Sequence, residues 1–241
     1  MASILLLGGT EEARRLAQML HTRGADFLTS LASSIGEDYP GPQRRGGFGG
    51  EEAMAQFLQE EGVKVVADAT HPFAAIISPT AKRAARKARV RYLRLERRPW
   101  RRSTADRWID VRSLEEAADS LDNGSTVFLT VGTGGLQPFL LRRDLHLVVR
   151  TIAEPSLGTR RDVVVLRDRG PFTVDGERAL FERHRFDAMV TKNSGGDATA
   201  AKLVAARERR TLVYMVKRPR GQPWANARTA DDMMRRLRRY L

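Results

Sequence analysis

Short apolar runs alternate with segments of helical periodicity along nearly the whole chain, and this alternation constrains the fold more than any other feature. Apolar runs in the first series occupy residues 3–7, 27–32, 64–69 and 90–95, with helical segments at residues 11–21, 51–61 and 79–88. The second series has apolar runs at residues 126–131, 145–150, 163–166, 188–191 and 212–216, with helical segments at residues 135–141, 175–184, 198–207 and 231–240. Strands that alternate with helices predict an α/β fold built on parallel sheets that helices cover on both faces.

The sequence changes character between the two series. Residues 97–107 read RRPWRRSTADR, which is basic and lacks clear periodicity. A chain of 241 residues is long enough for one large domain or two small ones. We therefore expect two similar α/β lobes, one over residues 1–97 and one over residues 98–241, although no repeat is visible between their sequences.

Basic residues are in large excess. The formal net charge is +13, and all but six of the 42 basic residues are arginines. Such a surplus attracts anions, so nucleic acid, an anionic membrane and a small polyanionic substrate are all candidate partners. Arginine also binds carboxylates through two parallel hydrogen bonds, which lysine cannot do. A biased genomic base composition would enrich arginine as well.

Three features narrow these candidates. The arginines are scattered along the chain, and the aromatic residues, at 7%, do not interleave with the basic runs, which disfavours a nucleic-acid-binding protein. No apolar run approaches the roughly 20 residues that cross a bilayer, and the run at residues 4–7 is too short for a signal-peptide core. Cysteine is absent, so there is no disulfide framework. We expect a cytoplasmic protein that binds neither nucleic acid nor membrane.

The first predicted strand ends in Gly8-Gly9-Thr10. Glycines there let the backbone approach a phosphate, the first amides of the next helix face the anion, and Thr10 can cap the helix or donate to the ligand. Ala13 stands near the place of the third glycine of a G-x-G-x-x-G fingerprint, so the turn is also compatible with an ordinary strand-to-helix connection.

The second predicted strand ends in serines and not in an acid. An NAD site typically has an acidic residue here that binds the ribose hydroxyls. This chain has Ser33 instead, followed by the loop GPQRRGGFGG at residues 41–50. Ser33, Arg44 and Arg45 suit a 2′-phosphate better, which favours NADPH over NADH. Gly46 and Gly47 would let the loop fold closely over the ligand. The alternative is a flexible, solvated basic loop.

The third predicted strand ends in Asp68-Ala69-Thr70-His71-Pro72. Pro72 lacks an amide hydrogen and biases His71 towards an extended conformation, which turns Thr70 and His71 towards a ligand. Asp68 lies on the same face of the strand as Thr70. Asp68 could orient His71 or a water molecule, or simply cap the following helix, and His71 could be an ordinary turn residue.

Two turns in the second half repeat the arrangement of a strand, glycines and a helix. The first contains Thr133 and Gly134, and the second follows the strand at residues 188–191. The second turn consists of a lysine, an amide, a hydroxyl and two glycines, namely Lys192, Asn193, Ser194, Gly195 and Gly196. These groups are donors suited to a carboxylate or a phosphate.

The motifs LLLGGTEEARRLA, GGFGG, DATHPFA, TVGTGG and TKNSGG, in this order and spacing, resemble those of the precorrin-6A reductase family of cobalamin biosynthesis. The resemblance covers nearly the whole chain. It implies two Rossmann-like lobes with the active site in the cleft between them. It also implies that NADPH reduces a double bond of the precorrin-6A macrocycle to give precorrin-6B.

The resemblance also implies roles for individual residues of these motifs. Cofactor-binding positions implied by the family motifs are Gly8, Gly9, Thr10, Arg44, Arg45, Gly46, Gly47, Thr70, His71, Thr133 and Gly134, and the KNSGG turn is assigned to the substrate. The acetate and propionate arms of precorrin-6A make it a polyanion that arginines can hold. His71 or Asp68 is the candidate for the proton step. The expected partner is this tetrapyrrole, and a monomer is compatible with the expectation.

Other enzyme classes fit the sequence less well. Short-chain dehydrogenases and nucleotide-sugar epimerases need a Tyr-x-x-x-Lys pair, and none of the four tyrosines has a lysine four positions later. The four histidines show no metal-ligand spacing, so no metal is expected. The remaining alternative is another NADPH-dependent oxidoreductase that acts on a polyanionic small molecule.

Overall fold

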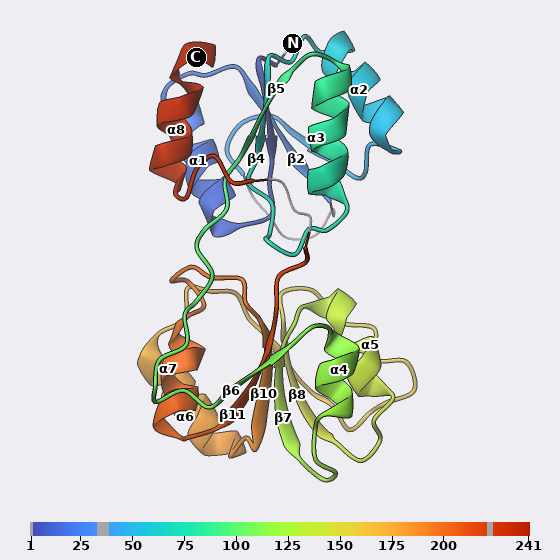
Figure 1. The fold of residues 1–241 in the computed structure, drawn as a ribbon, viewed down its shortest axis with the longest axis vertical. Helices are drawn as coiled ribbons and strands as arrows, with labels where there is room; N and C mark the ends of the chain where they lie inside the picture. Colours follow the sequence, from blue (N-terminus) through green and yellow to red (C-terminus); the bar gives the residue numbers. More distant parts are fainter. Residues whose placement is uncertain (1, 33–38, 221–223) are drawn as a thin grey trace. The chain divides into compact units, whose positions relative to one another are not determined.

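The computed structural model describes residues 2–32, 39–220 and 224–241. The chain forms two compact units (Figure 1): Met1–Arg98 with Pro219–Leu241 make the first, and Pro99–Arg218 makes the second. Chain order predicts a single lobe over residues 98–241, whereas the structure assigns the last 23 residues, Pro219–Leu241, to the first unit.

The sheet of the first unit has five strands in the order β3-β2-β1-β4-β5, and every pairing is parallel. The strands are β1 (Ile4–Leu7), β2 (Phe27–Leu31), β3 (Gln43–Arg45), β4 (Val65–Asp68) and β5 (Arg91–Arg94). Leu7 of β1 pairs with Ser30 of β2 on one side and with Asp68 of β4 on the other. The carboxyl ends of these three strands therefore lie side by side.

Helices cover both faces of this sheet (Figure 1). They are α1 (Glu11–Thr22) and α8 (Ala230–Leu237) on one face, and α2 (Glu51–Glu60) and α3 (Ile77–Lys87) on the other. Ile4 and Leu6 pack with α1 and α8, while Leu5 and Leu7 pack with α2 and α3. A strand buried on both faces has no polar side to show, which is why β1 reads as an unbroken apolar run.

The C-terminal segment returns to the first unit because its apolar side chains complete that core. Met233 and Leu237 of α8 pack with Leu16 and Leu20 of α1, and all four are fully buried. The chain before α8 runs beside the end of β5, where Ala227 forms an isolated parallel bridge with Leu95. Burial of this apolar face draws in a segment that chain order alone places elsewhere.

The sheet of the second unit has six strands in the order β6-β11-β10-β7-β8-β9, again with parallel pairings throughout. The strands are β6 (Trp108–Val111), β7 (Thr126–Thr130), β8 (His146–Thr151), β9 (Val164–Arg167), β10 (Ala188–Lys192) and β11 (Leu212–Val216). The predicted α/β class with parallel sheets is therefore confirmed. The apolar pattern missed β3 and β6, two short strands that each lie at an edge of their sheet.

The helices of the second unit are α4 (Leu114–Asp119), α5 (Gln137–Leu140), α6 (Val174–His184) and α7 (Ala201–Glu208). Figure 1 shows α6 and α7 on one side of the sheet and α4 and α5 on the other. The pattern missed α4, and the helix predicted at residues 135–141 is a single 3₁₀ turn, Thr133–Gly135, followed by the short α5. Trp100, in the predicted linker, packs against the core under α6 and α7.

Within the described residues, no helix is long and apolar enough to cross a membrane. The same part of the chain contains no group of three or more histidines, aspartates and glutamates that could hold a metal ion.

Candidate functional site

Thr10 joins the turn after β1 to the turn after β4. Its hydroxyl accepts a hydrogen bond from Ala13 N at the start of α1 and donates one to the carbonyl oxygen of Ala69 at 2.7 Å. The hydroxyl caps the helix and at the same time connects the two turns, which were both predicted to bind a ligand.

Gly8 and Gly9 of the same turn are required for different physical reasons. A Cβ on Gly8 would lie 2.8 Å from Leu31 Cδ2, so packing against β2 requires its absence. Gly9 has φ +105° and no atom within 4 Å of a built Cβ, which leaves open space beside a backbone conformation that favours glycine. Gly9 therefore fits the predicted close approach of a phosphate.

Tyr39 braces this turn, a role that the sequence analysis missed. The Tyr39 hydroxyl accepts from Gly9 N at 2.9 Å and donates to the carbonyl oxygen of Thr10 at 3.1 Å. Two acidic side chains in the first turn of α1 are directed to cations: Glu11 pairs with Arg14, and Glu12 pairs with Arg97. Their charges are thus offset, which favours an anion at the helix start.

Arg44 and Arg45, both predicted to bind the 2′-phosphate, differ in their surroundings. They are successive residues of β3, so their side chains point to opposite faces of the sheet. The Arg44 guanidinium donates to Ser30 Oγ and to the carbonyl oxygens of Gly46 and Gly47. It also lies 3.8 Å from the ring centroid of Phe48, and burial lowers its pKa. Arg44 therefore shapes the glycine loop from within.

Arg45 is exposed on the other face of β3, and one of its guanidinium nitrogens donates to Gln43 Oε1 at 3.2 Å. Of the two arginines, it is the one better placed to meet a ligand in solution. Ser33, the third residue predicted to bind the 2′-phosphate, lies outside the described residues.

Asp68 is the centre of a buried polar network. Its Oδ1 accepts from the backbone nitrogen and the hydroxyl of Thr70, at 3.0 and 2.7 Å. Its Oδ2 accepts from the Tyr92 hydroxyl at 2.6 Å and from Arg94 Nη1 at 2.8 Å. The side chains of Asp68 and Arg94 are both fully buried. Both carboxylate oxygens are engaged, so the network gives Asp68 the role of holding the Thr70 corner in place.

Ser78 closes the network from α3. Its hydroxyl lies 3.0 Å from the Thr70 hydroxyl and accepts from Arg94 Nη1 at 2.5 Å. Burial and the Asp68 carboxylate together raise the pKa of Tyr92, so its phenol stays protonated as a donor. The sequence did not identify Tyr92 or Arg94 as partners of Asp68, because they lie 24 and 26 residues further along the chain.

His71 is half-buried at the corner, and its Nδ1 accepts from Phe73 N at 3.2 Å. An accepting Nδ1 leaves the proton of the neutral imidazole on Nε2. The His71 ring also lies 5.8 Å from the Phe73 ring, centroid to centroid. The hydrogen bonds of Asp68 described above go to Thr70, Tyr92 and Arg94, and none of these four bonds is to the imidazole. Asp68 therefore supports the turn that carries His71.

In the second unit, Lys192 links the two predicted turns. β10 lies beside β7, and Lys192 Nζ donates to the carbonyl oxygen of Val131 at 2.7 Å. Burial lowers the pKa of Lys192. The residues after Val131, including Thr133 and Gly134, are exposed, and a Cβ on Gly134 would meet no atom within 4 Å. This turn thus has room for a ligand next to a lysine.

The rest of the KNSGG turn is held by internal contacts. The Asn193 amide accepts from Trp100 N and donates to Trp100 O, at 2.8 and 3.2 Å. Arg218 donates to the carbonyl oxygens of Asn193 and Ser194, and Trp100 Nε1 donates to Gly196 O. The amide of Asn193, which was predicted to be a ligand donor, thus contacts the backbone of Trp100. Gly195 and Gly196 adopt positive φ angles of 68° and 84°.

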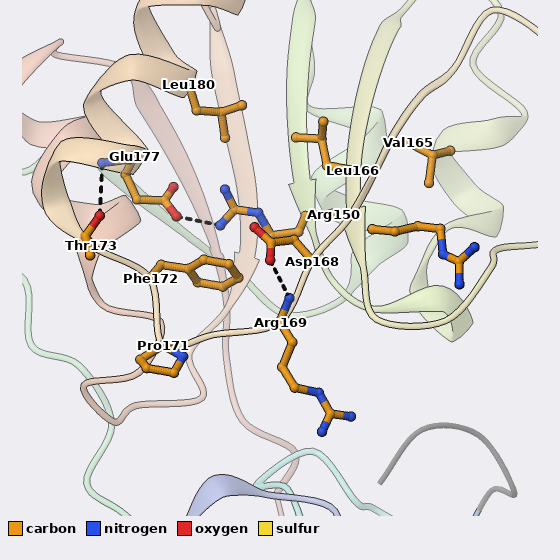
Figure 2. Close-up of a pocket in the computed structure, with 12 residues that line it drawn as sticks. Arg150, Val165, Leu166, Asp168, Arg169, Pro171, Phe172, Thr173, Glu177 and Leu180 are labelled. Atoms are coloured by element: carbon orange, nitrogen blue, oxygen red, sulfur yellow. Dashed lines mark hydrogen bonds and ion pairs between the residues drawn. The ribbon is translucent and has the colours of Figure 1, made fainter.

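The second unit also contains a pocket of about 540 Å³ that the sequence analysis missed (Figure 2). It lies between the ends of β8 and β9 and the start of α6, and residues that line it include Arg150, Leu166, Arg169, Phe172 and Glu177. Arg150 Nη1 donates to Glu177 Oε1 at 2.6 Å. The signal in the sequence is Glu177, an acidic residue on the buried face of α6.

Two parallel sheets, with glycine-bearing turns after β1 in the first unit and after the adjacent strands β7 and β10 in the second, define a Rossmann-like α/β protein. The strand order β3-β2-β1-β4-β5 is that of a doubly wound sheet. A family model described as "Precorrin-6x reductase CbiJ/CobK" matches residues 3–238. The chain belongs to this family of oxidoreductases, which confirms the resemblance of its motifs.

Relatives and a solved structure agree with this assignment. The chain is 39% identical over 237 residues to a precorrin-6A reductase of Rhodococcus erythropolis, covering 97% of this chain and 95% of that protein. It is 32% identical to a cobalt-precorrin-6A reductase of Priestia megaterium, covering 90% and 91%. A solved structure titled "CobK precorrin-6A reductase" matches all of this chain and 97% of that one with a TM-score of 0.92 and 36% identity.

Proposed function

We propose that this protein reduces one double bond of precorrin-6A to give precorrin-6B, with NADPH as the reductant. The observation that carries the proposal is membership of the reductase family over residues 3–238. Relatives named precorrin-6A reductase are 36–42% identical to this chain, and those named cobalt-precorrin-6A reductase are 29–32% identical. These identities favour the metal-free substrate.

Membership of a reductase family implies a nicotinamide cofactor, and the residues present fit one. The open turn at Gly9 precedes the capped N-terminus of α1, a helix of 12 residues whose first amides suit a phosphate. The exposed turn at Thr133 and Gly134 offers a second open backbone segment. The choice of NADPH over NADH rests on Arg45 and the glycine loop that Arg44 shapes.

The tetrapyrrole is assigned to the second unit. Lys192 and the backbone of the turn at Ser194, Gly195 and Gly196 supply donors for its carboxylates. The net charge of +13 would speed capture of such a polyanion.

NADPH, when bound, supplies the hydride. The protein must orient the two reactants, exclude water and provide a proton. We assign the proton to His71 Nε2, because Nδ1 is already occupied by the hydrogen bond from Phe73 N. Asp68 acts through Thr70, since both of its oxygens are engaged in the buried network.

Mixing the purified protein with precorrin-6A and NADPH tests the proposal. The nicotinamide absorbance should fall in step with conversion of the pigment, and NADH should be the weaker donor. Cobalt-precorrin-6A serves as the comparison substrate and should give the lower kcat/KM. Absence of NADPH oxidation with both pigments would refute the proposed function.

A further inference from the structure

The pocket between β8, β9 and α6 has an apolar wall and a cationic side. Leu166, Phe172 and Leu180 provide the apolar surface. Arg167 is the last residue of β9, and Arg169 lies in the segment that follows it. Figure 2 shows Arg150 between Leu166 and Phe172. A ligand suited to such a lining has a flat apolar body and a negatively charged arm.

Arg150 is held rigidly in this pocket. Its side chain is 10% exposed, and its guanidinium carbon lies 4.1 Å from the ring centroid of Phe172 and 4.9 Å from that of Phe128. Glu177, which is 1% exposed, accepts from Arg150 Nη1. Glu177 is therefore the more deeply buried of the two groups, and its ion pair with Arg150 holds the guanidinium in place.

The pair leaves hydrogen-bonding capacity unused. Arg150 Nε is buried and has no hydrogen-bond partner, and the same holds for Glu177 Oε2. A buried donor without a partner costs free energy. Because the guanidinium is the less buried member of the pair, an entering anion would meet Arg150 before Glu177 and could accept from Nε.

The charges around the pocket also favour an anion. Three arginines line it, against the two acids Asp168 and Glu177. Asp168 Oδ1 accepts from Arg169 N at 2.8 Å. Arg167 forms an ion pair of 3.3 Å with Glu154, and both side chains are more than 60% exposed. Exposed pairs of this kind contribute little, so Arg167 can exchange its partner at small cost.

We propose that this pocket is a subsite for one carboxylate arm of the tetrapyrrole. The carboxylate meets the guanidinium groups of Arg150 and Arg169, and the apolar edge of the macrocycle lies against Phe172 and Leu166. The inference rests on the proposed function for the identity of the natural ligand. A nucleotide phosphate shares the anionic chemistry, so the experiment must separate the two sources.

Two double variants test the subsite. Arg167→Gln with Arg169→Gln removes the charges at the outer side. Arg150→Gln with Glu177→Gln removes both buried charges together, so that neither is left unpaired. The matched control is Arg183→Gln with Arg209→Gln, which changes the net charge as the first variant does, at two residues near the C-terminal ends of α6 and α7 that do not line the pocket. Circular dichroism verifies that each variant is folded.

Two measurements are made on each variant. The first is the Kd of a porphyrin octacarboxylate, followed by its fluorescence, with the octamethyl ester as the neutral probe. The second is the KM for precorrin-6A and for NADPH. We expect the pocket variants to raise the octacarboxylate Kd and the precorrin-6A KM about tenfold, because a change of this size corresponds to the loss of one charge-assisted hydrogen bond. The NADPH KM, ester binding and the control variant should change less than twofold.

Two outcomes would overturn the subsite. In one, the NADPH KM rises while the octacarboxylate Kd is unchanged, which assigns the pocket to the nucleotide. In the other, both pocket variants match the control in every measurement. Failure of the proposed function is a separate result, since it appears as absence of turnover in the unaltered protein, and the octacarboxylate titration still decides whether the pocket binds carboxylates.

Discussion

Asp68 and Arg94 form an ion pair of 2.8 Å in which both side chains are completely buried. The pair connects the end of β4 to the end of β5 and supports the turn that carries Thr70 and His71. Removing Asp68 breaks this buried pair and leaves Arg94 with its ion pair to Glu96 at 2.9 Å, and breaking a buried pair typically costs about 3–5 kcal/mol.

Asp68→Ala should therefore lower the free energy of unfolding by about 3–5 kcal/mol. The measurement is urea denaturation followed by circular dichroism. Asp144→Ala, which breaks the more exposed pair with Arg142, is the control and should lower the free energy of unfolding far less. Equal effects from the two substitutions would contradict the role of the buried network.

The unaltered protein should be more stable than the Tyr92→Phe variant, and this difference in the free energy of unfolding should shrink at alkaline pH. The pKa of Tyr92 is raised in the folded state by burial and by Asp68, so the phenol's contribution is fully present below its unfolded pKa of about 10. Above that value the unfolded chain releases the proton and the folded protein keeps it. The stability advantage of the unaltered protein should then shrink by about 1.4 kcal/mol per pH unit.

The comparison is made by denaturation of both proteins between about pH 9 and pH 11. Other basic and phenolic groups titrate in both proteins alike and cancel in the difference. A gap that stays constant over this range would show that Tyr92 does not keep a raised pKa in the folded state.

Arg44→Ala and Arg45→Ala should separate two properties, because the side chains lie on opposite faces of β3. Arg44→Ala removes the bonds to Ser30, Gly46 and Gly47 and should lower the free energy of unfolding by about 1–3 kcal/mol. Arg45→Ala should leave stability unchanged and reduce the NADPH-to-NADH ratio of kcat/KM about tenfold, the loss of one phosphate contact. An unaltered cofactor preference in Arg45→Ala would exclude it from the 2′-phosphate site.

His71→Ala should lower kcat about 100-fold with little change in either KM, as expected for loss of a proton donor. His71→Gln places an amide donor near the position of Nε2 and His71→Asn places one near Nδ1, so the glutamine variant should position the substrate better than the asparagine variant. Steady-state kinetics with precorrin-6A and NADPH measures all three. Unchanged turnover in the alanine variant would remove His71 from the chemistry.

Lys192 should make substrate binding depend on pH. Burial lowers its pKa, so its ammonium loses its charge at a lower pH than an ordinary lysine, whose pKa is about 10.4. The KM for the tetrapyrrole should therefore rise with pH in the alkaline range before that value is reached. Lys192→Met should raise the KM at neutral pH and flatten its pH profile, and a profile identical to that of the unaltered protein would contradict the assignment.

The local features of this protein were readable from its sequence because they depend on neighbouring residues. The apolar run at β1 predicted a buried parallel strand, since both of its faces pack against helices. Thr10 was predicted to cap α1 or to donate to a ligand, and its hydroxyl accepts a hydrogen bond from a backbone nitrogen three residues later. The motif pattern predicted the reductase family, because such motifs are contiguous stretches of chain.

Partner choice across the chain was not readable in the same way. From the sequence, Arg44 and Arg45 were predicted to act together. In the structure they are successive residues of β3, which pairs with β2, so their side chains point to opposite faces of the sheet. Asn193 looked like a ligand donor, but Trp100, 93 residues earlier in the chain, occupies its amide. Neither β3 nor β6 has the long apolar run of a central strand, because each pairs on one side only.

The sequence by itself determined the α/β class, the parallel character of the sheets, the glycine turns at the strand ends and the family, because apolar periodicity and turn chemistry act over a few residues. Tertiary structure decided that α8 completes the core of the first unit, that Asp68 supports a turn from inside a buried network, and that Arg150 and Glu177 meet in a pocket. Those outcomes depend on burial and charge pairing between residues distant in the chain, and the energy of such contacts is defined only once the fold has brought the partners together.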